Sequence, residues 1–175
     1  WVVSDKLQRS VKTLETVASA GSALSVCGGS GMEAEFLAGR GARVVLADIS
    51  IGAVERALER SRRFGFELTG VVGDAERLPF ADGSFDLVFA HGVVQYTANP
   101  QRLVDECRRV LRPGGLAIFQ VYNRVSWLNA LSKLMKVDLE HDDAPVLLKF
   151  SIAEFRRLLS EYSDVRIVAE GFPVR

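Results

Sequence analysis

The sequence predicts an α/β fold in which a doubly wound, mostly parallel sheet is covered by helices on both faces. Short β-branched or apolar segments recur along the chain, and segments with helical spacing of apolar residues lie between them. Strand, helix, strand units with short links favour right-handed crossovers, which place helices on both sides of one sheet. The five predicted strands span residues 23–26, 43–47, 69–72, 85–90 and 116–121.

The chain has the size and composition of one domain, residues 1–175, with a single core, since 48% of its residues are hydrophobic. Basic and acidic residues number 22 each, so no net field attracts nucleic acid or an anionic membrane. We therefore expect a small-molecule partner; the oligomeric state stays open. No apolar run reaches the roughly 18 residues that span a bilayer, and the start lacks a signal-peptide pattern, which predicts a cytoplasmic protein.

The first two predicted helices have recognisable ends. Apolar residues recur at nearly helical spacing over residues 5–19, and Gly21 follows as a stop. Ser50 is a candidate N-cap for a helix over residues 51–63. The chain's two cysteines, Cys27 and Cys107, are expected to be reduced thiols.

Two more helices are indicated nearer the end of the chain. Asn99 and Pro100 fit an N-cap and the first helical position. Ser151 and Glu154 have the spacing of a reciprocal capping box. The helix that they open has an apolar stripe of Ile152, Phe155, Leu158, Leu159 and Tyr162. A sixth strand is expected at residues 165–169.

A glycine-rich turn, with Gly28, Gly29 and Gly31, follows the first predicted strand. In doubly wound sheets ligands bind beyond the carboxyl ends of the strands, and small residues there let backbone N–H groups reach a ligand. Asp48 ends the second strand, where its two oxygens can accept hydrogen bonds from both hydroxyls of a ribose. The structural alternative is that the glycines only form a tight turn and Asp48 only caps the next helix.

The turn also matches a dinucleotide pattern over residues 29–34, with Asp48 at a suitable distance, so a nicotinamide-dependent oxidoreductase is an alternative. Glu33 opposes it. Its capping-box spacing with Ser30 predicts a carboxylate in the first turn of the following helix. At ~6 Å and an effective dielectric of ~20, each like-charge contact with a pyrophosphate costs about 3 kcal/mol. A ligand with cationic groups suffers no such penalty.

Three further motifs follow in order, and they read GDAERLPF from Gly73, SFDLVFA from Ser84 and ECRRVLRPGGLAIF from Glu106. With the glycine-rich turn, residues 22–123 resemble class I S-adenosylmethionine-dependent methyltransferases of the small-molecule type. The resemblance implies a Rossmann-like fold, S-adenosylmethionine as cofactor, and methyl transfer to an oxygen, nitrogen or carbon of a small acceptor. The family adds an antiparallel final strand that this sequence lacks, so we expect the domain to be truncated at its C-terminus.

The resemblance also implies a set of cofactor-binding residues. The glycine-rich turn would line the methionine part, Asp48 would hold the ribose, and Ile49 would pack on adenine. Asp74 would accept from the adenine amine, with Leu78 as a wall. The full implied set is Cys27, Gly28, Gly29, Gly31, Asp48, Ile49, Asp74, Ala75, Glu76 and His91.

The sequence departs from the family pattern at several of these positions. Ser25 replaces the usual Asp or Glu, Cys27 replaces Gly, and Gln95 and Tyr96 replace an acidic and basic pair. These departures keep open a third hypothesis, a non-catalytic module that binds S-adenosylmethionine.

His91 follows the fourth predicted strand on the ligand side and is the candidate general base, because histidine titrates near neutral pH. Its alternative role is a wall of the cofactor pocket without proton transfer. A helix near residues 127–135 has an apolar stripe that fits either core packing or a lid over an apolar acceptor. The acidic segment at residues 138–143 is expected to be solvated, and we predict no metal.

Overall fold

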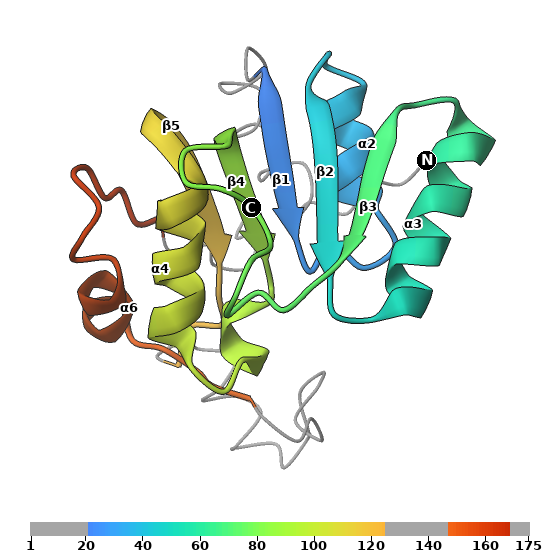
Figure 1. Ribbon diagram of the computed structural model, residues 1–175. Helices are drawn as coiled ribbons and strands as arrows, with labels where there is room; N and C mark the ends of the chain where they lie inside the picture. Colours follow the sequence, from blue (N-terminus) through green and yellow to red (C-terminus); the bar gives the residue numbers. More distant parts are fainter. Residues whose placement is uncertain (1–20, 125–146, 169–175) are drawn as a thin grey trace, which may run out of the picture.

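The computed structural model describes residues 21–124 and 147–168. Within them, five strands form one parallel sheet in the order β3-β2-β1-β4-β5. The strands are β1 (Ser22–Val26), β2 (Arg43–Asp48), β3 (Leu68–Val72), β4 (Phe85–His91) and β5 (Leu111–Gln120). Figure 1 shows the central position of β1. The chain winds outward from β1 to β3 and then crosses to β4, which confirms the doubly wound α/β fold and puts the switch point between β1 and β4.

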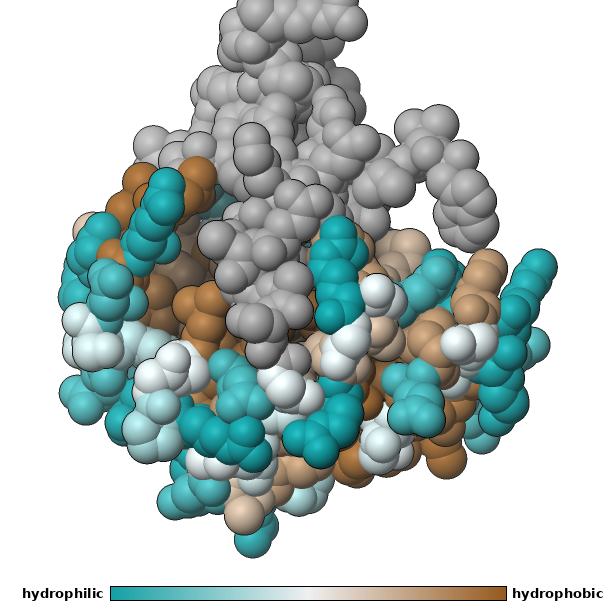
Figure 2. All heavy atoms as spheres, turned by 90° about the horizontal axis from the view of Figure 1, so that it is seen from above, coloured by the Kyte–Doolittle hydropathy of each residue, from teal (hydrophilic) through white to brown (hydrophobic). Residues whose placement is uncertain are grey.

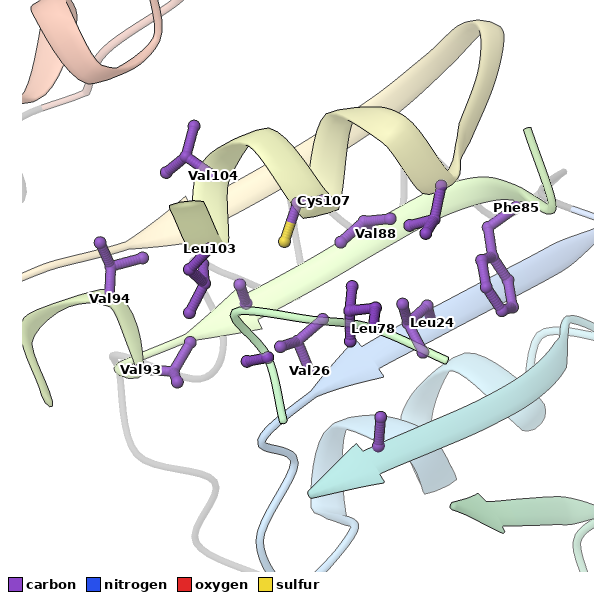
Figure 3. Close-up of a cluster of buried hydrophobic side chains, with 14 of the residues drawn as sticks. Leu24, Val26, Leu78, Phe85, Val88, Val93, Val94, Leu103, Val104 and Cys107 are labelled. Carbon is purple, nitrogen blue, oxygen red and sulfur yellow. The ribbon is translucent and has the colours of Figure 1, made fainter. Parts of the chain in front are cut away.

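Helices cover both faces of this sheet, as predicted. Helices α2 (Met32–Ala38) and α3 (Ile51–Phe64) pack on one face, and α4 (Pro100–Val110) and α6 (Ile152–Leu158) on the other (Figure 1). Alternate side chains of a strand serve the two cores, so Ala23 contributes to the first and Leu24 to the second. In the second core, Leu103 and Cys107 of α4 point toward Val88 of β4 (Figure 3).

The predicted helix caps on α3, α4 and α6 are confirmed. Ser50 Oγ accepts from Ala53 N at 3.3 Å, and Asn99 Oδ1 accepts from Arg102 N at 3.1 Å. The reciprocal capping box of Ser151 and Glu154 is formed. Each of these caps joins residues three positions apart, so the cap can be predicted from the local sequence.

Three expectations need correction. The predicted fifth strand, residues 116–121, corresponds to β5, which begins at Leu111 and has an irregular register before Leu116. Residues 165–168 form no strand, and residue 169 lies outside the described residues. Ile152 is 46% exposed, so it does not belong to the buried stripe of α6, because it lies in the helix's first turn. The expected helix at 5–19 and the segments 127–135 and 138–143 also lie outside the described residues.

The residues on either side of the segment 125–146 meet at the carboxyl end of β5. Phe150 N donates to Tyr122 O at 3.0 Å, and Arg124 N donates to Phe150 O at 2.8 Å. Leu148 N donates to Gln95 O at 2.8 Å, and Gln95 belongs to the short 3-10 helix η1 (Val94–Tyr96) after β4. A backbone strap, residues 147–150, therefore joins the chain that follows β4 to the chain that follows β5.

Hydrophilic and apolar residues alternate over the described surface that Figure 2 presents, the end of the sheet from which the strands start. Among the described residues, no helix combines the length and apolar character needed to cross a membrane.

Candidate functional site

The turn between β1 and α2 is built from backbone conformations that most side chains avoid. Cys27, Gly29 and Gly31 have φ of 51°, 53° and 77°. Cys27 N donates to Ala47 O at 2.7 Å, which extends the pairing of β1 with β2 into the turn. A Cβ on Gly28 would lie 2.4 Å from Ser25 Oγ, so only glycine fits there. A Cβ on Gly29 would meet nothing within 4 Å, and the backbone at that point borders open space.

The predicted capping box of Ser30 and Glu33 is wrong. Gly31, in the left-handed conformation, is the N-cap of α2, and no side chain caps the helix. The glycine is required by packing, because a Cβ there would lie 3.0 Å from Ala57 Cβ of α3. Ser30 is exposed. Glu33 does lie in the first turn of α2, as expected, but its carboxylate points toward β4.

Glu33 pairs with His91 at the switch point. His91 Nδ1 lies 2.8 Å from Glu33 Oε1, and the two side chains are 29% and 13% exposed. An ionised carboxylate only accepts hydrogen bonds, so the tautomer that suits this contact carries its proton on Nδ1. The contact joins the first turn of α2 to the last residue of β4, which are 58 positions apart.

A cavity of about 220 Å³ opens beside this pair. Four parts of the chain line it: the end of β1, the glycine-rich turn, the start of α2 and the end of β4. The lining residues are Ser25, Val26, Cys27, Gly28, Gly29, Ser30, Met32, Glu33, Phe89 and His91. The turn residues Cys27, Gly28 and Gly29 and the strand residue His91 thus meet as expected, whereas Gly31 packs against α3 and does not line the cavity.

Asp48 does not line this cavity, but it contacts the backbone of the glycine-rich turn. The residue is 8% exposed, its Oδ2 accepts from Gly29 N at 3.3 Å, and its Oδ1 accepts from Ser50 N at 2.9 Å. The side chain that caps α3 is that of Ser50, so Asp48 steadies both the glycine-rich turn and the loop before α3. Ile49, next to it, is 70% exposed.

The loop after β3 places the second predicted acid beside the first. Gly73 N donates to Asp48 O at 3.0 Å, so the chain just before Asp74 lies beside the end of β2. Asp74 is exposed, and its Oδ1 accepts from Glu76 N at 2.8 Å, while Ala75 is buried. Glu76 Oε1 accepts from the backbone N–H of Asn99 at 2.8 Å. None of the residues in this nucleoside-side group, Asp48, Ile49, Asp74, Ala75 and Glu76, lines the cavity.

Leu78 differs from its expected role as a pocket wall. Its side chain is 3% exposed and lies with Leu24 and Val26 in the core beneath α4 (Figure 3). An apolar side chain in a loop is compatible with either position, and only the packing distinguishes them.

The carboxylates around the turn make its surroundings electronegative. The pKa of Cys27 is raised to about 12, first by burial and then by the negative charges of Asp48 and Asp74. Its thiol is therefore neutral at physiological pH. Among the residues that line the cavity, the titratable ones are Cys27, Glu33 and His91, with no lysine or arginine. Such surroundings favour a cationic ligand group over a phosphate.

Sequence reasoning missed two contributions to this site. The pairing of Glu33 with His91 has no sequence signal, because residues 58 positions apart are brought together only by the fold. Phe89 did have a sequence signal, because it precedes His91 by two positions in β4, and residues two apart in a strand lie on the same face of the sheet. Beyond the cavity, the buried side-chain oxygens Oε1 of Gln95 and of Gln120 have no hydrogen-bond partner among the described residues. In the part of the chain that the structure describes, no cluster of histidine, cysteine and acidic side chains suits a metal ion.

Comparisons with known proteins bear on the family and the fold. Residues 24–119 match the methyltransferase domain model. Malonyl-[acyl-carrier protein] O-methyltransferase of Methylococcus capsulatus is 46% identical over 68 residues, which cover 38% of this chain and 25% of that protein. Demethylmenaquinone methyltransferase of Beutenbergia cavernae is 36% identical over 104 residues, which cover 59% of this chain and 42% of that protein. The chain thus matches less than half the length of each relative.

Solved structures share the fold. The PH0226 protein of Pyrococcus horikoshii superposes with a TM-score of 0.72 at 22% identity, over 91% of this chain and 82% of that one. The family match covers more than half of the chain and includes the glycine-rich turn, Asp48, Asp74 and His91. The chain therefore belongs to the methyltransferase domain family, among the class I S-adenosylmethionine-dependent methyltransferases.

Proposed function

We propose that this domain binds S-adenosylmethionine and transfers its methyl group to an oxygen, nitrogen or carbon atom of a small molecule. The observation that carries the proposal is the juxtaposition of an open glycine-rich backbone with acidic side chains at the switch point of the sheet. We also propose that the protein is cytoplasmic and acts without nucleic acid, membrane or metal.

The residues present fit this cofactor. The cavity next to Gly29 accepts the amino-acid part, because the backbone there borders open space. Asp48 and Asp74 lie at the ends of adjacent strands, where Asp48 holds the ribose hydroxyls and Asp74 the adenine amine. The exposed side chain of Ile49 packs on the adenine ring, and the backbone of Ala75 and Glu76 borders its edge. When bound, the cofactor supplies a methyl carbon activated by the adjacent sulfonium.

The acidic surroundings argue against a nicotinamide cofactor. A pyrophosphate in the cavity beside the turn would meet the carboxylate of Glu33 and feel the negative charges of Asp48 and Asp74 nearby. No lysine or arginine lines the cavity to offset that repulsion. The dinucleotide pattern at residues 29–34 is then a consequence of the tight turn and of the packing of Gly31 against Ala57.

The chain's contribution to transfer is chiefly alignment, which supplies about 7–11 kcal/mol in well-oriented reactions. Cys27, Gly28, Gly29 and Gly31 shape the turn that fixes the donor. His91, beside the same cavity, is the proposed base for acceptors that lose a proton. Two relatives methylate chemically different acceptors by name, so the acceptor class is left to experiment.

Isothermal titration of the purified chain with S-adenosylhomocysteine and, separately, with NAD⁺ tests the cofactor. Saturable binding is expected for the first ligand and not for the second, and Asp48→Asn is expected to weaken it. Tight binding of NAD⁺ alone would overturn the proposal. Methyl-tritiated S-adenosylmethionine with a panel of phenols, carboxylic acids, amines and quinols then tests transfer. Binding without transfer to any acceptor would favour the non-catalytic module instead.

A further inference from the structure

Glu33 is the one carboxylate among the residues that line the cavity. One of its two oxygens is already hydrogen-bonded to His91. Its Oε1 accepts from His91 Nδ1 at 2.8 Å. No described residue bonds its second oxygen, Oε2. Since the side chain is only 13% exposed, a cationic hydrogen-bond donor that enters the cavity would meet this oxygen with little competing water.

From this geometry we infer that Glu33 binds the ammonium group of the cofactor's amino-acid end through Oε2, while His91 holds the carboxylate in place. The inference rests on the proposed function, and it adds a recognition residue that the resemblance does not supply. It also accounts for Ser25, which lines the same cavity where relatives usually have an acid, because Glu33 brings a carboxylate to that space from α2.

The ammonium group suits this oxygen better than the sulfonium does. An ammonium carries three N–H donors, whereas a sulfonium carries none and offers charge alone. The two charges can be told apart with three ligands: S-adenosylmethionine has both, S-adenosylhomocysteine keeps only the ammonium, and methylthioadenosine has neither.

Isothermal titration of Glu33→Gln with these ligands is the test. We expect S-adenosylmethionine and S-adenosylhomocysteine to bind about tenfold or more weakly than to the unaltered protein, as for one lost charge-assisted hydrogen bond. Methylthioadenosine is expected to bind both proteins equally. Glu35→Gln is the matched control, because Glu35 lies on the same helix, pairs with Arg60 at 2.6 Å and does not line the cavity. It should leave all three affinities unchanged.

His91 acts through Glu33, so its conservative variant distinguishes positioning from packing. Asn offers an N–H close to the place of Nδ1, and His91→Asn should retain more affinity for S-adenosylhomocysteine than His91→Ala. Unchanged affinity of Glu33→Gln for S-adenosylhomocysteine would overturn the inference alone. So would an equal loss for methylthioadenosine, which would mean that the substitution disturbs the turn. Failure of the unaltered protein to bind any of the three ligands would overturn the proposed function and the inference with it.

Discussion

The guanidinium Nη1 of Arg109 donates a 2.7 Å hydrogen bond to the carbonyl oxygen of Phe80. The same guanidinium reaches the carbonyl of Leu78 at 3.0 Å, and Glu106 accepts both from Arg109 and from Leu78 N. One arginine of α4 thus holds the loop that follows β3, and that loop carries Asp74. The position of a proposed adenine contact therefore depends on direct bonds between α4 and this loop.

Arg109→Lys is expected to lower the free energy of unfolding by about 1–3 kcal/mol, because a lysine cannot reproduce the forked donors that reach both carbonyls. Urea denaturation measures the change. The affinity for methylthioadenosine should fall as well, since the loop beneath Asp74 loosens. Arg108→Lys, at the exposed neighbouring position, is the control and should change neither quantity. Full stability of Arg109→Lys would show that the loop is held by Leu78 packing alone.

Gly28→Ala should destabilise the protein by about 1–3 kcal/mol through overpacking. The added Cβ would lie 2.4 Å from Ser25 Oγ and 2.8 Å from Leu46 Cδ1, both in crowded surroundings. Thermal unfolding followed by circular dichroism measures the effect. Gly52→Ala is the matched control, because in α3 its Cβ would meet the flexible end of Arg56 at 3.3 Å and Ser50 Oγ at an ordinary 4.0 Å. That control should be neutral or stabilising by about 0.5–1 kcal/mol.

The thiol of Cys27 should react slowly with alkylating reagents although the residue is only half-buried. Its pKa of about 12 leaves on the order of a thousandfold less thiolate near pH 8 than an ordinary cysteine holds. Iodoacetamide labelling followed by mass spectrometry compares the folded protein with the protein in urea. Labelling at similar rates in both states would contradict a pKa raised by burial and by the negative charges of Asp48 and Asp74.

Glu154 should make part of the stability depend on acidic pH. Hydrogen bonds from the backbone and hydroxyl of Ser151, and then one from Arg124, lower its pKa to about 2. A lowered pKa in the folded state means a contribution that is fully present above the unfolded pKa of about 4.3 and is lost as pH falls toward 2. The stability difference between the unaltered protein and Glu154→Gln should shrink over that window. Urea denaturation at several pH values measures it, and a constant difference would contradict the assignment.

The elements that sequence predicted well are those set by neighbouring residues. Strands β1 to β4 follow from apolar and β-branched runs, and the caps at Ser50, Asn99 and Ser151 need only the next turn of helix. The start of β5 was harder to predict from the sequence. Pro113 and the glycines after it read as a stop, yet Leu111 pairs with Phe85 across an irregular register that only the partner strand supports.

The sequence predicted where in the fold the candidate site lies, but it did not predict the side-chain contacts within that site. The turn after β1 and the residues that end β2 and β4 mark the switch point in sequence, because parallel strands end at a common edge. The role of Glu33 was not predictable, since Ser30 and Glu33 match a capping box and only the packing of Gly31 against Ala57 prevents it. A tertiary contact, and not the local sequence, sets the start of α2.

The hydrogen bonds of Phe150 with Tyr122 and Arg124 hold the chain together at the carboxyl end of β5. The entropic cost of closing a loop between Arg124 and the strap, residues 147–150, rises by only about 0.6 kcal/mol for each doubling of loop length. The intervening stretch is thus free to diverge, or to be exchanged for a foreign one, while the pairing and the glycine-rich half stay intact. Residues 124 and 147 therefore mark the borders at which a segment could be exchanged without altering the described pairing.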